Sequence, residues 1–461
     1  MDTLALSRLQ FALTIGYHFL YPPLSIGLGV LLVVFGALYL RTRDPLWHQV
    51  NRYWIRIFAL TFSMGVATGI VQEFQFGTNW STYSRFVGDV FGSALAAEGI
   101  FAFFLESGFL AVLLFGGDRI GPRLHFASIV IVALGAHFSA IWITVANSWM
   151  QTPAGYEVVE GAFGPRAQIT DFWAMVFNPS SVTRLSHVLL ASWLTGTFMV
   201  LSVSAWYLLK RKHQAFAMAS LKVGLIVALA ALLAQFVAGD ASARYVARYQ
   251  PTKLAAEEGH WPVSAPAPLY LIGWVDAQAE KTYGIAIPGG TSFLLYGDPH
   301  APVTGLKAFP PSELPPLQIP FQSFHFMVAI YMGLLGLALL AGLLYWRGGI
   351  ARTRWVLWPL VFSVLGPMAA NQLGWATAEV GRQPWIVFNL LRTADAFSPN
   401  VSAQQVLVSI SLFSFIYLLL LGVFLFLLNE KIQHGPDEVD AQGPIVGLPD
   451  TLRELFSRPR A

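Results

Sequence analysis

Long apolar stretches separated by short polar connections dominate the chain. A helix that crosses a bilayer needs about 20 consecutive, mostly apolar residues. Nine stretches meet this length, at residues 11–40, 54–77, 91–115, 125–148, 183–209, 220–239, 323–346, 355–380 and 403–429. The pattern predicts an all-α polytopic membrane protein with about nine transmembrane helices packed in bundles.

Basic residues gather in alternate connections, which indicates how the chain is oriented, because cytoplasmic loops are enriched in Lys and Arg. The connections after the first, third, fifth and seventh spans carry Arg41, Arg43, Arg52, Arg56, Arg119, Arg123, Lys210, Arg211, Lys212, Lys222, Arg347, Arg352 and Arg354. These connections are predicted to be cytoplasmic. The odd number of spans then places the N-terminus outside and the C-terminus inside.

One connection is much longer than the others. Residues 240–322 are rich in Pro and Gly, and a connection of that length is usually either functional or disordered. Its mixture of apolar and charged residues favours a partly ordered lid on the outer surface. The expected divisions are therefore spans one to six over 1–239, the outer loop over 240–322, spans seven to nine over 323–429, and a cytoplasmic tail over 430–461, with at most a short amphipathic helix at 448–456.

Composition narrows the chemistry further. Apolar residues make up 55% of the 461 positions and charged residues only 11%, which excludes an ordinary soluble protein. The net charge of +3 offers no general attraction to nucleic acid. The chain has no Cys, which excludes zinc-thiolate sites, iron–sulfur clusters and thiol nucleophiles. Any metal would have to be bound by His, Met or carboxylate side chains.

Ionisable side chains inside apolar spans are costly and usually mark a ligand or a proton route. In the predicted topology the outer ends of the spans carry His18, Glu73, Glu98, His187, Met327 and Glu379. This arrangement predicts a polar cluster in the outer half of the membrane, beneath the long loop. His and Met are also the axial ligands of some haem irons.

Each of these residues also has a purely structural interpretation. A Met in a membrane helix usually packs, and a single His such as His48, His137 or His213 is usually hydrogen-bonded rather than metal-bound. Glu98 and Glu106 lie about 12 Å apart along a continuous helix and could simply pair with other polar groups. Two acids on one span nevertheless favour a proton route, which His125, Ser139 and Asn147 on the next span could extend.

Several local sequences resemble subunit I of the cytochrome bd-type quinol oxidases. They are SRLQFALTIGYHF (7–19), GVATGIVQEFQFGTNW (65–80), the stretch from Gly88 to AFFLES (102–107), VANSWMQTPAG (145–155) and EVGRQPW (379–385). The resemblance extends to about residue 430. It implies a bacterial plasma-membrane enzyme that oxidises quinol and reduces dioxygen to water, works in the lipid bilayer with a subunit II, and in some members carries a small single-helix subunit.

The resemblance also implies roles for individual residues. His187 and Met327 would bind a low-spin haem b, and His18 and Glu379 would bind a high-spin haem b and a haem d. Glu98 and Glu106 match the family's acidic pair, while Trp375 and Arg382 match positions near the haems. In TKLAAEEGHW (252–261), Lys253 and Glu258 match the quinol-binding positions.

The chain departs from the family at two points. His325 stands where several members have Arg, so a permanent positive charge near the low-spin haem is missing. The loop looks like the short form, and some short-loop members resemble the cyanide-insensitive branch, in which a further haem b can replace haem d. The sequence leaves both haem types open.

Two other functions are compatible with polar-lined spans. A secondary transporter would carry buried carboxylates, but it typically has inverted repeats and broken helices at the membrane centre. An electron-transferring haem b subunit without oxygen chemistry would need only His/His or His/Met pairs, which leaves Glu379 unexplained.

Overall fold

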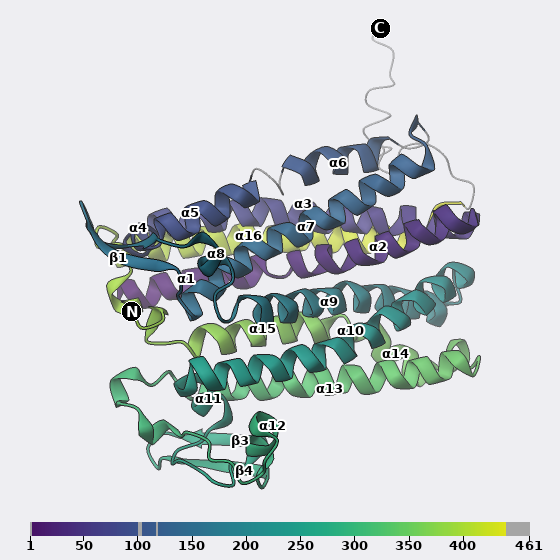
Figure 1. Cartoon of the computed structure of the whole chain (residues 1–461). Coiled ribbons are helices and arrows are strands. Elements are labelled where there is room, and N and C mark those ends of the chain that lie inside the picture. Colours follow the sequence, from purple (N-terminus) through teal and green to yellow (C-terminus); the bar gives the residue numbers. More distant parts are fainter. Residues whose placement is uncertain (1, 100–103, 117–118, 439–461) are drawn as a thin grey trace.

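The computed structural model describes residues 2–99, 104–116 and 119–438. Long helices run side by side along one axis, as Figure 1 shows. They are α1 (Thr3–His18), α2 (Pro22–Thr42), α3 (Pro45–Thr78), α7 (Pro122–Gln151), α9 (Ser181–Lys210), α10 (Gln214–Tyr249), α13 (Gln318–Trp346), α14 (Arg354–Phe362), α15 (Leu365–Val380) and α16 (Ala403–His434). Among the described residues, 8 helices or helix pairs are long and apolar enough to span a membrane, which confirms the predicted fold class.

Three expected spans differ from the continuous helices predicted. The first begins at Thr3 rather than residue 11 and breaks before Pro22 and Pro23, because proline cannot continue a helix. The eighth is divided into α14 and α15 at residues 363–364. The third corresponds to α5 (Gly88–Ala97) and α6 (Phe104–Phe115), and residues 100–103 between them, which include the start of AFFLES, lie outside the described residues.

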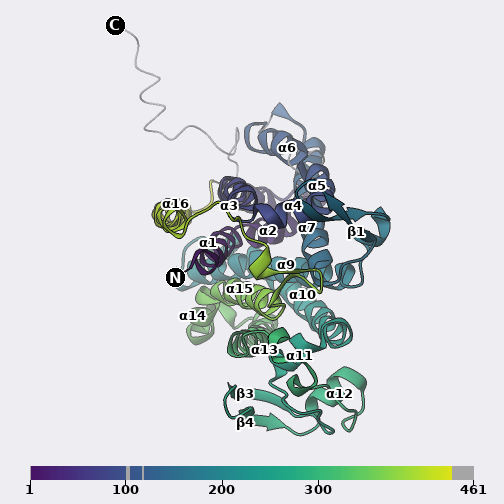
Figure 2. The same ribbon diagram turned by 90° about the vertical axis from the view of Figure 1, so that its left-hand side faces the viewer.

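Close helix contacts hold the centre of the bundle together. A Cβ added to Gly196 on α9 would lie 2.3 Å from the Gly27 carbonyl carbon on α2, so only glycine permits this approach. Small residues allow membrane helices to pack in this way. Figure 2, viewed along the helices, places α9 and α15 near the middle of the bundle and α16 at its edge.

Short elements gather at the end of the bundle where α1 begins (Figure 1). They include α4 (Ser81–Phe86), α8 (Phe172–Val176), α11 (Pro251–Glu258) and α12 (Gly290–Tyr296). Three antiparallel hairpins join them, made of β1 (Tyr156–Gly161) with β2 (Gly164–Ile169), β3 (Leu269–Asp276) with β4 (Lys281–Ile287), and β5 (Trp385–Val387) with β6 (Leu391–Arg392). The N-terminus and the long loop therefore share one end of the molecule.

The long loop is shorter than expected. Helix α10 continues to Tyr249 and α13 already begins at Gln318, so the loop proper covers residues 250–317. The predicted boundaries followed hydropathy, which drops once charged residues enter a helix although the helix itself continues. At the opposite end of the bundle, Asp437 forms ion pairs with Arg52 and Arg56 just beyond α16. The tail helix expected at 448–456 lies outside the described residues.

Candidate functional site

One large cavity in the bundle collects the side chains singled out in the sequence. Its volume is 1340 Å³, larger than the roughly 300–1,000 Å³ typical of a pocket for one small ligand. The cavity is lined by His18, Glu98, Glu106, His187, Lys253, Glu258, Met327, Trp375, Glu379 and Arg382, among others. Residues that are separated by up to 364 positions in the sequence thus share a single space.

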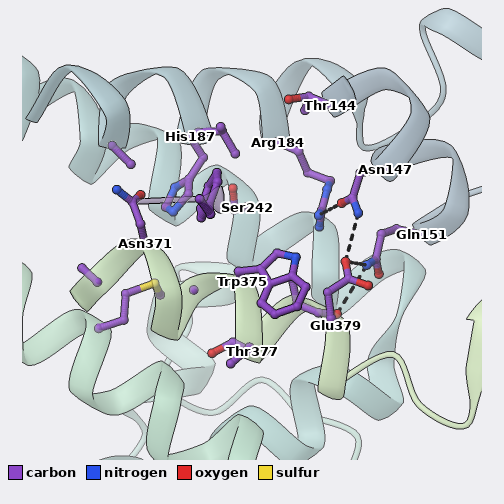
Figure 3. Close-up of a pocket in the computed structure, with 18 of the residues that line it drawn as sticks. Thr144, Asn147, Gln151, Arg184, His187, Ser242, Asn371, Trp375, Thr377 and Glu379 are labelled. Carbon is purple, nitrogen blue, oxygen red and sulfur yellow. Dashed lines mark hydrogen bonds between the residues drawn. The ribbon is translucent and has the colours of Figure 1, made fainter. Parts of the chain in front are cut away.

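Glu379, at the end of α15, is the centre of a polar network (Figure 3). Its Oε1 accepts hydrogen bonds from the side-chain amides of Asn147 at 3.0 Å and Gln151 at 3.3 Å, both on α7. Its Oε2 is paired with the guanidinium of Arg382. A carboxylate has about four lone-pair sites, so Glu379 retains capacity for a further partner. Figure 3 also shows the Trp375 indole beside the same cavity.

Two buried arginines accompany this network, and sequence reasoning gave a role to only one of them. Arg184 on α9 donates a hydrogen bond to the Asn147 side-chain oxygen. Within the described part of the chain, Nε of Arg184 and both Nε and Nη1 of Arg382 are buried without a hydrogen-bond partner. Buried guanidinium groups are costly unless they are compensated. The cavity therefore suits a ligand that carries negative charge close to these nitrogens.

His18 is held in a defined orientation at the end of α1. Its Nδ1 lies 2.9 Å from the Thr68 hydroxyl, whose own proton goes to the Met64 carbonyl oxygen at 2.8 Å. Nδ1 must then be the donor, which leaves Nε2 unprotonated and able to bind a metal. A Cβ at Gly69 would lie 3.2 Å from His18 Cε1, so the glycine provides room for the ring.

His187 and Met327 line the cavity from α9 and α13. The Gln235 side-chain nitrogen lies 3.2 Å from each ring nitrogen of His187. Met327 is packed against a glycine of α15, because a Cβ at Gly374 would lie only 2.9 Å from the Met327 sulfur. Both potential ligands thus contact side chains or backbone that restrict their orientation.

A stripe along α7 connects the acidic pair with Glu379. Residues 135, 139, 143, 147 and 151 of α7 are spaced four apart, so each step advances about 6 Å along the helix and turns about 40° around it. Gly135 provides the space for Glu106, because a Cβ added at Gly135 would lie only 2.3 Å from Glu106 Cγ. One step further along α7, the Ser139 hydroxyl donates a hydrogen bond to Glu98 Oε1 at 2.5 Å. Oε1 of Glu106 is buried without a hydrogen-bond partner among the described residues.

Helix α11 brings three ionisable side chains to the cavity wall. The Lys253 ammonium donates to the side-chain oxygens of Gln151 at 2.5 Å and Gln250 at 2.6 Å. Burial, with the nearby Arg184 charge, lowers the pKa of Lys253, while burial raises the pKa of Glu257. Burial also raises the pKa of Glu258 to about 7, although a hydrogen bond from Thr291 opposes this. Glu257 was not selected from the sequence, where an acid beside another acid in a loop carries no distinct signal.

Comparisons with known proteins identify the family. The sequence profile described as cytochrome bd terminal oxidase subunit I matches residues 6–436. The chain belongs to this family. A solved structure of the bd oxidase from Geobacillus thermodenitrificans superposes with a TM-score of 0.87 at 32% identity, covering 94% of this chain and 99% of that chain.

Three relatives in the cytochrome bd family match this chain over nearly its whole length. Cytochrome bd ubiquinol oxidase subunit 1 of Bacillus subtilis is 38% identical over 95% of both chains. Cytochrome bd-II ubiquinol oxidase subunit 1 of Escherichia coli is 33% identical over 96% of this chain and 99% of its own. A putative cytochrome bd menaquinol oxidase subunit I of Bacillus subtilis is 32% identical over 95% of this chain and 99% of its own.

The residues that line the cavity fit the haem that this family carries. Within the described ranges no group of three or more His, Cys, Asp or Glu residues could hold a bare metal ion. A porphyrin supplies four ligands itself and needs only one or two from the protein, which His18, His187, Met327 and Glu379 can provide. The carboxylate groups of a haem also suit the buried nitrogens of Arg184 and Arg382.

His325 has a structural role at the point where the chain departs from the family pattern. Its Nδ1 lies 2.7 Å from the Phe321 carbonyl oxygen on the same helix, and its Nε2 lies 2.8 Å from the Tyr270 carbonyl oxygen on β3. The ring therefore connects the long loop to α13, two residues before Met327.

Proposed function

We propose that this chain is the haem-containing catalytic subunit of a terminal oxidase that oxidises quinol at the outer membrane face and reduces dioxygen to water. The observation that carries the proposal is the single cavity, in which side chains suited to quinol and side chains suited to haem iron are linked through Gln151. The relatives named as ubiquinol oxidase subunits support the same reaction.

Four residues would hold three haems. His187 and Met327 bind a low-spin haem b, while His18 and Glu379 bind a high-spin haem b and a haem d, or a further haem b in its place. Haem iron supplies reversible one-electron transfer and the binding and reduction of dioxygen. Arg184 and Arg382 contribute positive charge to this part of the cavity, and Trp375 limits the space available beside Glu379.

Lys253 and Glu258 would receive the quinol head group. The Lys253 side chain donates hydrogen bonds, which suits a quinol oxygen whose negative charge grows as its proton leaves. Glu258 has a pKa raised to about 7 by burial, so near neutral pH it can accept that proton. Both residues lie on α11 at the end of the bundle assigned to the outer face, so the released protons would leave on that side.

The protons consumed in making water would come from the cytoplasm through Glu106 and then Glu98. Along α7, Gly135 beside Glu106 is further from the outer end than Ser139 beside Glu98. Proton uptake from the cytoplasm and proton release at the outer face would together generate a proton gradient by charge separation. The basic connections support a cytoplasmic C-terminus and an outer N-terminus.

Cytochrome bd oxidases combine subunit I with a subunit II in a bacterial membrane. We propose that a small single-helix subunit also joins this assembly, and that no nucleic acid takes part. The quinol is either ubiquinol or menaquinol, since relatives of both names match the chain.

An optical spectrum of the purified assembly, reduced with and without carbon monoxide, tests the proposal. We expect low-spin and high-spin haem bands, with a carbon monoxide shift in the high-spin bands only. A haem spectrum without that shift would identify an electron carrier, and a protein without haem would identify a transporter. Either result would reject the oxidase function.

A further inference from the structure

The hairpin formed by β3 and β4 exposes a continuous apolar face. Ile272 is paired with Ile285, and Trp274 with Tyr283, so these four side chains share one face of the two strands. Ile272 is 72% exposed and Ile285 is 68% exposed, and the other two are also exposed. The opposite face packs on the protein, with Val275 buried. An exposed apolar face of this kind usually marks a surface that binds another protein, a ligand or a membrane.

Three hydrogen bonds fix how the hairpin lies against α13. The Val275 backbone nitrogen donates to Gln318 Oε1 at 3.1 Å, and Gln322 Nε2 donates to the Gly273 carbonyl oxygen at 2.8 Å. The third joins His325 Nε2 and the Tyr270 carbonyl oxygen at 2.8 Å. Strand β3 therefore runs antiparallel to the first two turns of α13. The turn after Asp276 points away from the membrane, and the base of the hairpin points into it.

The length of α13 sets the depth of this contact. Its 29 residues extend about 43 Å, while the hydrocarbon layer is about 30 Å thick, so roughly 7 Å project at each end. The step from Gln318 to His325 covers about 10 Å along the axis. The base of the hairpin thus reaches the boundary between head groups and acyl chains. The highly exposed Trp346 at the other end of α13 is typical of the opposite boundary.

The order of side chains along the hairpin matches this depth. Charged residues occupy its tip, where Glu280 pairs with Lys307 at 2.5 Å. Trp274 and Tyr283 follow, and the aliphatic pair Ile272 and Ile285 lies nearest the base. Trp and Tyr favour the head-group level of a bilayer, and aliphatic side chains favour the level below it.

We propose that the outer face of the β3–β4 hairpin is a membrane-binding surface whose partner is the outer lipid leaflet. Trp274 and Tyr283 lie among the head groups, and Ile272 and Ile285 contact the acyl chains. Further along α13, beyond its contact with the hairpin, the apolar side chains of Phe326 and Val328 are also exposed. Lipid, rather than another protein chain, is the partner that this gradient from charged to aromatic to aliphatic side chains favours.

The position of the hairpin has a consequence for substrate access. Leu271, Ile272 and Leu294 are exposed and also line the large cavity, so the cavity opens to the surface beside the hairpin. A hairpin in the outer leaflet places this opening where a lipid-soluble quinol is dissolved. This consequence rests on the proposed function, whereas the lipid contact does not.

Site-directed fluorescence quenching tests the lipid contact in the complete assembly. Because the chain has no Cys, Ile285→Cys introduces a single site that can carry a bimane label, and the parent assembly gives the background. Leu339→Cys, at an exposed position of α13, is the matched lipid-facing control. His300→Cys, at an exposed position of the long loop, is the matched aqueous control. The quenchers are phosphatidylcholine with a doxyl group at acyl carbon 5, and iodide in solution.

We expect the doxyl lipid to quench the label at Ile285→Cys at least threefold more than the label at His300→Cys, and iodide to show the reverse order. Iodide quenching equal to that of His300→Cys would mean a water-exposed hairpin. Protection from both quenchers would mean that another subunit covers the face. Either outcome overturns the proposal, and Trp274→Cys provides a second label position. The haem spectrum of the same sample reports separately on the proposed function.

Discussion

The ammonium nitrogen of Lys253 lies 2.5 Å from the side-chain oxygen of Gln151. The same Gln151 side chain donates through its amide nitrogen to Glu379 Oε1 at 3.3 Å. One buried amide therefore connects the residue proposed to bind quinol with a residue proposed to bind haem iron. Changes at either end of this connection should be detectable at the other.

Replacing Gln151 with Leu should affect both ends. We expect the quinol KM to rise several-fold, because Lys253 loses one of two acceptors, and the high-spin haem bands to shift, because Glu379 loses a donor. Gln250→Leu is the matched control, since it removes the other acceptor of Lys253 and should alter the quinol kinetics alone. Spectra and steady-state kinetics of both variants check this. A Gln151→Leu spectrum identical to that of the parent would contradict the connection.

The pH dependence of quinol oxidation should report on Glu258. Its pKa is raised to about 7 by burial, and only the deprotonated carboxylate can accept a proton. The value of kcat/KM for quinol should therefore increase as the pH rises through about 7. Glu258→Gln should remove this dependence and lower kcat/KM by about 10²-fold, the lower range for general-base catalysis.

Glu160→Gln, on the exposed hairpin strand β1, is the matched control for Glu258→Gln and should leave the pH profile unchanged. Stopped-flow measurements between pH 5.5 and 8.5 (roughly 1.5 pH units on either side of the expected pKa) provide the profile. A Glu258→Gln enzyme that keeps the parent's acid limb would assign that limb to another group.

Much of this arrangement was predictable from the sequence. Apolar run length located the spans, and costly polar residues within them identified His18, His187 and Glu379, because the lipid environment makes such residues rare without a function. The breaks before Pro22 and between α14 and α15 lie inside uninterrupted apolar runs, so hydropathy does not reveal them.

Other features depend on contacts between distant segments. In the sequence, Arg184 is one of several charged residues near the predicted outer ends of the spans. Only the packing of α7, α9 and α15 shows that its side chain is buried beside Asn147. The hydrogen bonds between β3 and α13 likewise have no local sequence pattern. Only the family resemblance suggested the proposed roles of Lys253 and Glu258, because the composition of a long loop does not indicate them.

Proton supply should depend on Glu106. Glu106→Gln removes a titrating group but keeps its shape, so turnover with excess quinol should slow while haem content is unchanged. Gly135→Ala should have a similar effect, because the new methyl group would lie 2.3 Å from Glu106 Cγ and displace it. Gly108→Ala on α6 is the matched control, since no atom lies within 4 Å of its added Cβ. Proton uptake from the cytoplasmic side of liposomes is the measurement, and normal uptake with normal turnover in Glu106→Gln would exclude the relay.

Met327 should be sensitive to the size of residue 374. Gly374→Ala would place a Cβ 2.9 Å from the Met327 sulfur and move that side chain away from its position. We expect weaker low-spin haem bands, although alanine itself favours the helix by up to about 1 kcal/mol. Gly336→Ala on α13, where no atom lies within 4 Å of the added Cβ, should leave the spectrum intact. A full low-spin spectrum in Gly374→Ala would mean that Met327 tolerates displacement and is not an axial ligand.

We propose that electrons from quinol enter through a haem held by His187 and Met327 and reach a separate oxygen-reducing site in the same cavity. Quinol-driven oxygen consumption by Met327→Leu and His187→Ala, recorded with the haem spectrum of each sample, tests it most directly. We expect the low-spin bands and oxygen consumption to disappear, while the high-spin bands and their carbon monoxide shift persist. Oxygen consumption at the parent's rate, with the low-spin bands unchanged, would contradict it.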